Sequence, residues 1–270
     1  MSATYLDRIL AAKRAAAAGD DRPLDDLVAT ARQLPPTRGF AAALTAGDRL
    51  AVIAEVKRRS PSKGDLAADL DPAALAGDYA AGGAAALSVL TDAEFFGGSA
   101  ADLAAARGAV GLPVLRKDFT VGERDVCDAR LMGADAVLLI AAALDDAELH
   151  ACASLAAEVG LDALVEVHDE GELERALAVG ATLVGVNQRD LVTFAVDTDR
   201  AVRVAAAIPD GVVAVAESGI GGPDDARRLA DAGYDAVLVG ESLVRSADPT
   251  AAVGALGVPR VGGARRGERR

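Results

Sequence analysis

An acid and a base stand two residues apart near the end of one apolar segment, at Glu55 and Lys57. Side chains on a β-strand alternate between its two faces, so these two side chains point to the same side. The strand cannot continue far, because Ser-Pro-Ser-Lys-Gly follows at positions 60–64 and proline lacks the amide hydrogen that a central strand needs. We therefore predict a proton donor and a proton acceptor together at a rim where a strand ends.

Polar residues also stand at the ends of four further apolar segments. They are Lys117 in Leu115-Arg116-Lys117-Asp118-Phe119, Glu166 with His168, Asn187 with Arg189, and Glu217 with Ser218. Burying charged side chains costs free energy, so a purely structural design would rarely place consecutive charges between an apolar strand and a phenylalanine. This favours a functional role for Lys117. We assign His168 to a structural position at the rim. Lysines among the carboxylates, without a His or Asp cluster, predict no metal site.

Glycine-rich turns follow the last two apolar segments, at positions 218–223 and 240–242. Such turns expose backbone N–H groups, and a helix that starts beside them directs the positive end of its dipole at the same point. Because the two turns follow neighbouring segments, we predict that together they bind the phosphate of an anionic substrate.

The elements that must hold these residues alternate between strand and helix. We expect strands at 50–56, 85–90, 113–116, 136–140, 163–167, 183–186, 212–216 and 236–239. Ala, Leu, Glu and Arg recur at helical spacing between them. Strands that are apolar on both faces belong to a parallel sheet covered by helices, and eight such units predict an α/β fold, the (βα)8 or TIM barrel. In such barrels the active site lies at the carboxyl ends of the strands, where the polar residues stand.

We interpret residues 1–270 as a single barrel domain. Three near-copies of one phrase, at 132–137, 179–184 and 232–237, place a glycine between a helix and the next strand, as repeated units would. Residues 1–48 form an extra helical segment, with Tyr5, Ile9 and Leu10 as an apolar stripe that caps one mouth of the barrel. The Gly- and Arg-rich end, 258–270, is expected to be a mobile basic tail, and its role stays open.

Composition restricts the class of protein further. A net charge of −13 argues against nucleic acid as a partner, because phosphate backbones need a broad basic surface. Cys127 and Cys152 have neither metal-site nor disulfide spacing. Every apolar run is interrupted before it reaches membrane-spanning length, so we expect no membrane association and a cytoplasmic location. We expect a monomer, and association with a partner enzyme stays open.

Taken in order, the motifs resemble those of the indole-3-glycerol-phosphate synthase family. The resemblance rests on 55–57, 60–64, 88–92, 96–99, 115–119, 165–168, 187–191 and 216–219, and it covers about residues 50–249. It implies a carbon–carbon lyase of tryptophan biosynthesis. Such an enzyme closes 1-(2-carboxyphenylamino)-1-deoxyribulose 5-phosphate to indole-3-glycerol phosphate with loss of carbon dioxide and water, and it needs no cofactor.

The resemblance also implies roles for individual residues. Lys117 would be the general acid that protonates the ketone oxygen, and Glu166 would transfer a proton during dehydration. Lys57 would bind the substrate carboxylate, and the division of the second step between Lys57 and Glu166 stays open. The residues that would position these groups are Glu55, Asn187 and Glu217, with Arg189 bracing Asn187.

The same resemblance implies where the substrate lies. Phosphate would bind Ser218, Gly219 and Gly240, with Lys57 and Ser60 nearby. The apolar slot for the aromatic ring would consist of Phe96, Phe119, Leu138 and Val239, each of which also suits the barrel core. Three residues depart from the family pattern, namely Arg59, Gln188 and Glu241. Since the Glu241 carboxylate would repel phosphate, we predict that only its backbone N–H contributes to the site.

Two other interpretations were weighed against this one. Phosphoribosylanthranilate isomerase has the same fold and phosphate site, but its type uses an acidic residue and a cysteine at strand ends, whereas both cysteines here fall in expected helices. A catalytically idle barrel kept as a binding subunit is the other interpretation, and the presence of every proposed charge argues against it.

Overall fold

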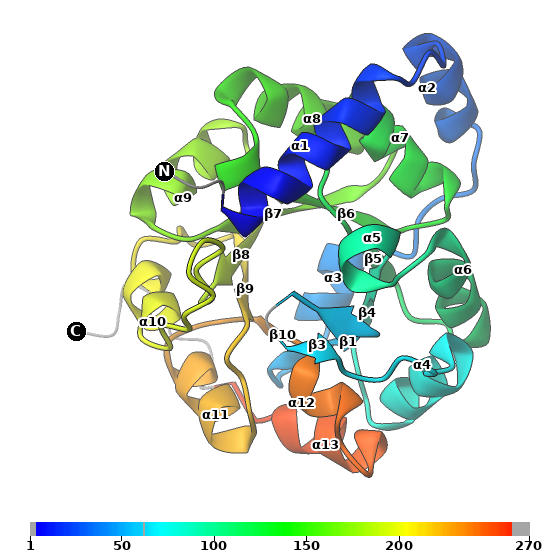
Figure 1. The fold of residues 1–270 in the computed structure, drawn as a ribbon. Coiled ribbons are helices and arrows are strands. Elements are labelled where there is room, and N and C mark those ends of the chain that lie inside the picture. The colour runs from blue at the N-terminus through cyan, green and yellow to red at the C-terminus, as the bar shows by residue number, and fades with distance from the viewer. Residues whose placement is uncertain (1–3, 62, 261–270) are drawn as a thin grey trace.

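A closed barrel of eight parallel strands forms the centre of the computed structural model, which describes residues 4–61 and 63–260 (Figure 1). In the order in which they pair around the barrel, its strands are β1 (Ala51–Val56), β10 (Ala236–Val239), β9 (Val213–Glu217), β8 (Leu183–Asn187), β7 (Asp162–Val167), β6 (Ala136–Ile140), β5 (Val114–Lys117) and β4 (Ala86–Leu90). β4 pairs with β1 and closes the ring. The predicted (βα)8 barrel is confirmed, and each strand lies within one residue of its predicted bounds.

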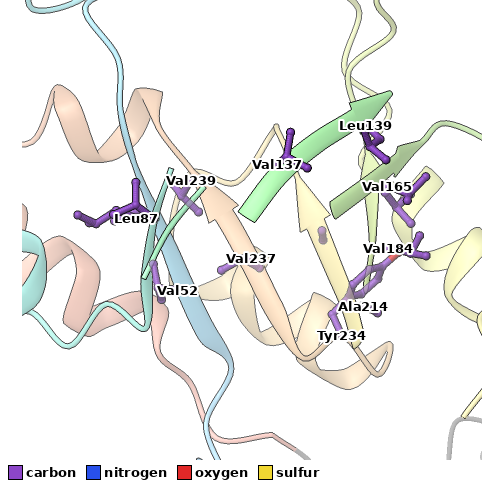
Figure 2. Close-up of a cluster of buried hydrophobic side chains, with 14 of the residues drawn as sticks. Val52, Leu87, Val137, Leu139, Val165, Val184, Ala214, Tyr234, Val237 and Val239 are labelled. Carbon is purple, nitrogen blue, oxygen red and sulfur yellow. The ribbon is translucent and has the colours of Figure 1, made fainter. Parts of the chain in front are cut away.

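Side chains on the barrel strands alternate between the interior and the surrounding helices. Ile53 and Leu164 belong to the inner apolar cluster, whereas Val52 and Val165 pack in the outer one between strands and helices (Figure 2). Two positions beyond Ile53 and Leu164 on the same inward faces stand Glu55 and Glu166. The alternation therefore carries the charged side chains into the barrel at the end where the strands finish.

Helices cover the outside of the barrel (Figure 1). They are α4 (Pro72–Ala81), α6 (Ala100–Ala109), α7 (Glu123–Leu131), α8 (Asp146–Glu158), α9 (Glu170–Ala178), α10 (Arg200–Ala205), α11 (Pro223–Asp231) and α13 (Pro249–Leu256). Shorter elements lie in the loops that follow strands. They are the antiparallel pair β2 (Arg59–Ser60) and β3 (Gly64–Asp65), α5 (Ala93–Phe96), the 3-10 turn η1 (Ala141–Ala143) and α12 (Glu241–Val244). Ser62 of the predicted motif lies outside the described residues.

The repeated Gly-containing phrase ends three of these helices in the same way. Gly133, Gly180 and Gly233 have φ of 89°, 78° and 98°, a left-handed conformation that glycine adopts without steric cost. The amide of the next residue then bonds a carbonyl inside the helix, as Ala134 N–H does to Ala129 O at 3.0 Å. Each unit thereby turns directly from its helix into the next strand.

The N-terminal segment contacts both ends of the barrel. It contains α1 (Tyr5–Ala18), α2 (Leu24–Arg32) and α3 (Phe40–Thr45). α1 crosses the mouth at the carboxyl ends of the strands (Figure 1). Its residues Tyr5 and Ile9 border the central cavity. Phe40 and Leu44 of α3 are buried in the inner cluster against residues at the beginnings of strands. The sequence predicted a cap at one mouth of the barrel, whereas α1 covers the mouth at the carboxyl ends of the strands and α3 closes the opposite end.

The first residues of the predicted tail are held against the barrel. Val258 O accepts a hydrogen bond from Leu50 N, and Pro259 forms a bridge with Arg49. The Arg260 guanidinium pairs with Asp235 at 2.9 Å. The expectation of a tail from Val258 was wrong for 258–260, because these residues extend along the start of β1. Positions 261–270 lie outside the described residues.

Candidate active site

A cavity of about 450 Å³ opens at the carboxyl ends of the barrel strands. All the residues predicted for the site border it. They are Glu55, Lys57, Ser60, Phe96, Lys117, Phe119, Leu138, Glu166, Asn187, Arg189, Glu217, Ser218, Gly219, Val239, Gly240 and Glu241. His168 is not among its lining residues, in agreement with the structural position expected for it.

Lys117 lies at the centre of the charged groups. Its ammonium is 3.0 Å from Glu166 Oε2 and 3.5 Å from Glu217 Oε2. Burial lowers the pKa of Lys117, but the neighbouring carboxyl groups of Glu166, Glu217 and Glu55 outweigh this loss of hydration and hold the pKa well above its usual value. Lys117 is therefore protonated at neutral pH. Glu166 is nearer to the ammonium than Glu217 is.

The two carboxyl groups beside Lys117 differ in their surroundings. Glu166 accepts hydrogen bonds from Lys117 and from Asn187 Nδ2, both at 3.0 Å. Although burial raises the pKa of Glu166, these cationic and polar partners lower it overall. Burial raises the pKa of Glu217 to about 8, and Glu217 Oε1 is buried without a hydrogen-bond partner. At neutral pH Glu166 is therefore ionised, whereas Glu217 holds a proton up to about pH 8.

Glu55 and Lys57 form the pair that the alternation of β1 predicts, with Lys57 Nζ 2.5 Å from Glu55 Oε1. Ser88 Oγ donates to the other carboxylate oxygen at 3.3 Å. Gly240 leaves the room for this pair, because a Cβ there would lie 2.4 Å from Glu55 Oε1 and 3.0 Å from Lys57 Nζ. Any side chain at position 240 would therefore displace the ion pair.

Asn187 connects Glu166 with the loop after β8. Its Nδ2 donates to Glu166, and its Oδ1 accepts the backbone N–H of Arg189 at 3.0 Å. The Arg189 guanidinium instead donates to the carbonyl of Phe194 at 3.1 Å. The predicted bracing of Asn187 is therefore made by the backbone of Arg189, while its side chain holds the loop.

The predicted phosphate loops lie side by side at the ends of β9 and β10. Ser218 has φ of 66°, a conformation uncommon for a residue with a side chain, and its carbonyl accepts Gln188 Nε2 at 2.7 Å. Gln188, which departs from the family pattern, thus supports the turn. Ser242 Oγ donates to Ile220 O at 3.0 Å and ties the two loops together. Glu241 is partly buried at the cavity border.

An apolar wall faces these polar groups. The rings of Phe96 and Phe119 lie 6.1 Å apart, and both border the cavity. Leu138 also borders it and belongs to the inner cluster. Val239 borders the cavity and packs in the outer cluster (Figure 2). Its neighbour Leu238 belongs to the inner cluster and also borders the cavity, so it is a further candidate for the ring slot that sequence reasoning missed.

Sequence reasoning missed how α1 is held over the cavity. Lys13 Nζ lies 2.8 Å from Asp92 Oδ2 and 2.6 Å from Asp118 Oδ1, and both aspartates are buried. Arg116 and Thr91 also bond Asp118. The available signal was the position of Asp118 directly after Lys117. Its partner lies 105 residues away, which no local pattern indicates.

Residues 4–61 and 63–260 contain neither a metal-binding cluster of side chains nor a membrane-spanning helix. No group of three or more His, Cys, Asp or Glu side chains there is arranged to hold a metal ion. No helix of this part of the chain is both long and apolar enough to cross a membrane.

Known proteins resemble this chain in sequence and in fold. The profile of the family described as indole-3-glycerol phosphate synthase matches residues 6–256. A Nocardioides protein of that name is 62% identical over 202 residues, covering 75% of this chain and 78% of the relative. Another, from Laribacter hongkongensis, is 50% identical over 254 residues, covering 92% and 97%. A solved 3-hexulose-6-phosphate synthase shares the fold, with a TM-score of 0.60 at 17% identity over 77% of this chain and 98% of that one.

Proposed function

The chain belongs to the indole-3-glycerol phosphate synthase family, and from that premise we propose which of its residues move the protons of the reaction. The enzyme closes 1-(2-carboxyphenylamino)-1-deoxyribulose 5-phosphate to indole-3-glycerol phosphate in tryptophan biosynthesis. The aromatic carbon that carries the carboxylate bonds to the ketone carbon, carbon dioxide leaves that ring carbon, and water leaves the former ketone. Each step needs a proton delivered or removed at a defined atom.

Lys117 is the general acid of the ring closure. Its ammonium carries a proton at neutral pH because three carboxyl groups surround it. As the aromatic carbon attacks, negative charge grows on the ketone oxygen, and a proton from Lys117 neutralises it. The contacts at 3.0 and 3.5 Å to Glu166 and Glu217 direct Nζ toward the cavity and hold it there.

Glu166 transfers the proton in the dehydration, and Lys57 binds the substrate carboxylate. At neutral pH Glu166 is ionised and can accept a proton, whereas Glu217 already holds one because its pKa is raised to about 8. The Lys57 ammonium, fixed by Glu55, offers a cation to the carboxylate until carbon dioxide leaves. Glu166→Gln should therefore reduce kcat, and Lys57→Ala should raise KM for the substrate more than it reduces kcat.

The remaining contacts orient the substrate across the cavity. Phosphate binds the loops at 218–220 and 240–242 through backbone N–H groups and the Ser218 hydroxyl. The aromatic ring lies against Phe96, Phe119 and Leu138. These two ends are separated by the charged groups, so the reacting carbon atoms lie beside Lys117. Glu241 contributes its backbone N–H alone and keeps its carboxylate toward solvent.

The observation that carries these assignments is the contact of one buried ammonium with two carboxyl groups from different strands. The test is turnover of the deoxyribulose substrate by the pure protein, followed by indole absorbance. Removing a general acid costs about 100- to 10,000-fold in rate, and Lys117→Ala should lose activity in that range. The exposed Lys63→Ala serves as the matched control and should keep full activity. Wild-type rates in Lys117→Ala would refute the acid assignment.

The isomerase alternative requires a cysteine at a strand end. Cys127 and Cys152 are free and buried in α7 and α8, outside the cavity. Substitution of both by alanine should therefore leave turnover intact, provided that the protein still folds.

We also propose a monomeric enzyme located in the cytoplasm, and we treat residues 1–270 as one barrel domain with an N-terminal extension. Free buried thiols fit a reducing compartment. Light scattering across a range of concentrations tests the monomer, and a constant mass near 27.2 kDa is expected. A mass that doubles with concentration would contradict it.

A further inference from the structure

His168 lies behind the cavity, in contact with a carboxyl group on each side. It follows β7 on the same face as Glu166, and its Nε2 is 3.8 Å from Glu166 Oε1. On the other side Nδ1 is 2.9 Å from Oε2 of Glu172, a residue of the first turn of α9. The imidazole of His168 therefore lies between the partly exposed carboxylate of Glu172 and the ionised carboxylate of Glu166 in the active site.

The hydrogen bonds determine how the imidazole is protonated. Glu172 Oε2 accepts the backbone N–H of His168 at 2.8 Å and also faces Nδ1, so Nδ1 carries a hydrogen. Nε2 is buried and has no hydrogen-bond partner. A neutral ring would direct the lone pair of Nε2 at the negative Glu166 oxygen. A protonated ring directs an N–H at it, which is the favourable arrangement.

Glu166 is then enclosed by three groups that favour its charged form. Lys117 bonds Oε2, while Asn187 Nδ2 bonds Oε1 and His168 faces the same atom. We propose that His168 is a positioning residue for Glu166, whose imidazolium, oriented by Glu172, keeps the Glu166 carboxylate ionised and able to take a proton from the substrate. This inference rests on the role proposed above for Glu166.

The charges around the ring support a raised pKa. Burial lowers the pKa of His168, but Glu172 and Glu166 outweigh it and raise the pKa overall, although Arg200 of α10 opposes them. Arg200 is itself held by a bond from Nη1 to Asn187 O at 3.1 Å. By linkage, a carboxylate that raises the pKa of a histidine has its own pKa lowered by the same interaction.

The chain offers a direct measurement, because it contains only two histidines. NMR of isotopically labelled histidine side chains therefore follows His168 beside one other residue, His150, which is exposed on α8. We expect His168 to titrate above the ordinary histidine value of about 6.5. In Glu166→Gln and in Glu172→Gln its midpoint should fall by about one pH unit. A His168 midpoint at or below that ordinary value, or unchanged in Glu166→Gln, would overturn the proposal.

The pH profile of kcat supplies the second readout. His168→Gln removes the positive charge, so the pKa of Glu166 should rise and the acidic limb should shift upward by about one pH unit, with KM unchanged. Glu172→Gln should shift the limb in the same direction, and the double variant no further. A structural role alone would lower kcat and Tm without moving the limb, and a folded His168→Gln enzyme with the wild-type limb would refute the proposal. The NMR titration measures the interaction between His168 and Glu166 without turnover, so its outcome does not depend on the proposed function.

Discussion

Lys117 and Glu166 come from strands that are not neighbours, yet their charged atoms are 3.0 Å apart inside the barrel. β6 lies between β5 and β7, and its inward residues are apolar in this layer. The two side chains therefore meet across the interior, above the apolar layers that fill the barrel below them. A proton donor and a proton acceptor thereby lie in direct contact, although the strands that carry them are not hydrogen-bonded to each other.

The protonation of Glu217 should appear in the stability of the protein. Its pKa is raised from an ordinary value of 4.5 to about 8, so between these values the folded state binds a proton that the unfolded state has lost. The contribution to the free energy of unfolding is present at low pH and decreases as pH rises, by at most about 1.4 kcal/mol per pH unit. Urea unfolding at pH 5, 6.5 and 8 should show this decrease in the wild type and lose it in Glu217→Gln. Glu94→Gln, at an exposed position, should keep the wild-type slope.

Removing the Lys13 ammonium should loosen α1 from the barrel. Lys13→Met leaves the buried Asp92 and Asp118 side by side without their shared cation, and we expect a loss of about 2–4 kcal/mol in unfolding free energy. KM should also rise, because α1 brings Tyr5 and Ile9 to the cavity.

The matched control for Lys13→Met is Arg32→Met on α2. Arg32 pairs with Glu158 at 2.6 Å, but its side chain is 58% exposed, so the loss should stay below about 1 kcal/mol. Equal losses in the two variants would mean that the Lys13 contacts hold α1 no better than a surface ion pair does.

A methyl group at Gly240 should displace the Glu55–Lys57 pair. The backbone φ of −123° is open to alanine, so the effect of Gly240→Ala is steric and arises from the 2.4 Å approach to Glu55 Oε1. A displacement of about 1 Å in such a site costs roughly 100-fold in kcat/KM. Gly108→Ala, inside α6 with nothing near its added methyl group, should keep activity and gain about 0.5–1 kcal/mol in stability.

Shortening Phe119 should weaken substrate binding more than catalysis. Phe119→Ala removes one of the two rings of the apolar wall, and we expect KM to rise about tenfold while kcat changes less. Val192→Ala, in the loop after β8 with 54% of the residue exposed, is the control and should leave KM unchanged. A fall in kcat with constant KM would place Phe119 among the groups that position the reacting atoms.

Much of this site is visible in the sequence because its causes are local. The alternation that directs Ile53 inward also directs Glu55 inward, and a proline-containing motif at 60–64 shows that β1 must end near there. The family resemblance was less exact than the alternation. It named Val239 for the ring slot, whereas the neighbour in the inner cluster is Leu238. It also implied that Arg189 braces Asn187, and the backbone of Arg189 rather than its side chain makes that contact.

By itself the sequence determined the number of barrel strands, where each one ends and which charges stand at those ends, since strand alternation and turn chemistry act over a few residues. Only the tertiary structure decided that Lys117 meets Glu166, that Lys13 joins two aspartates over the mouth, and that His168 faces the back of Glu166. These contacts depend on the pairing register and closure of the barrel, which bring distant parts of the chain within a few ångströms.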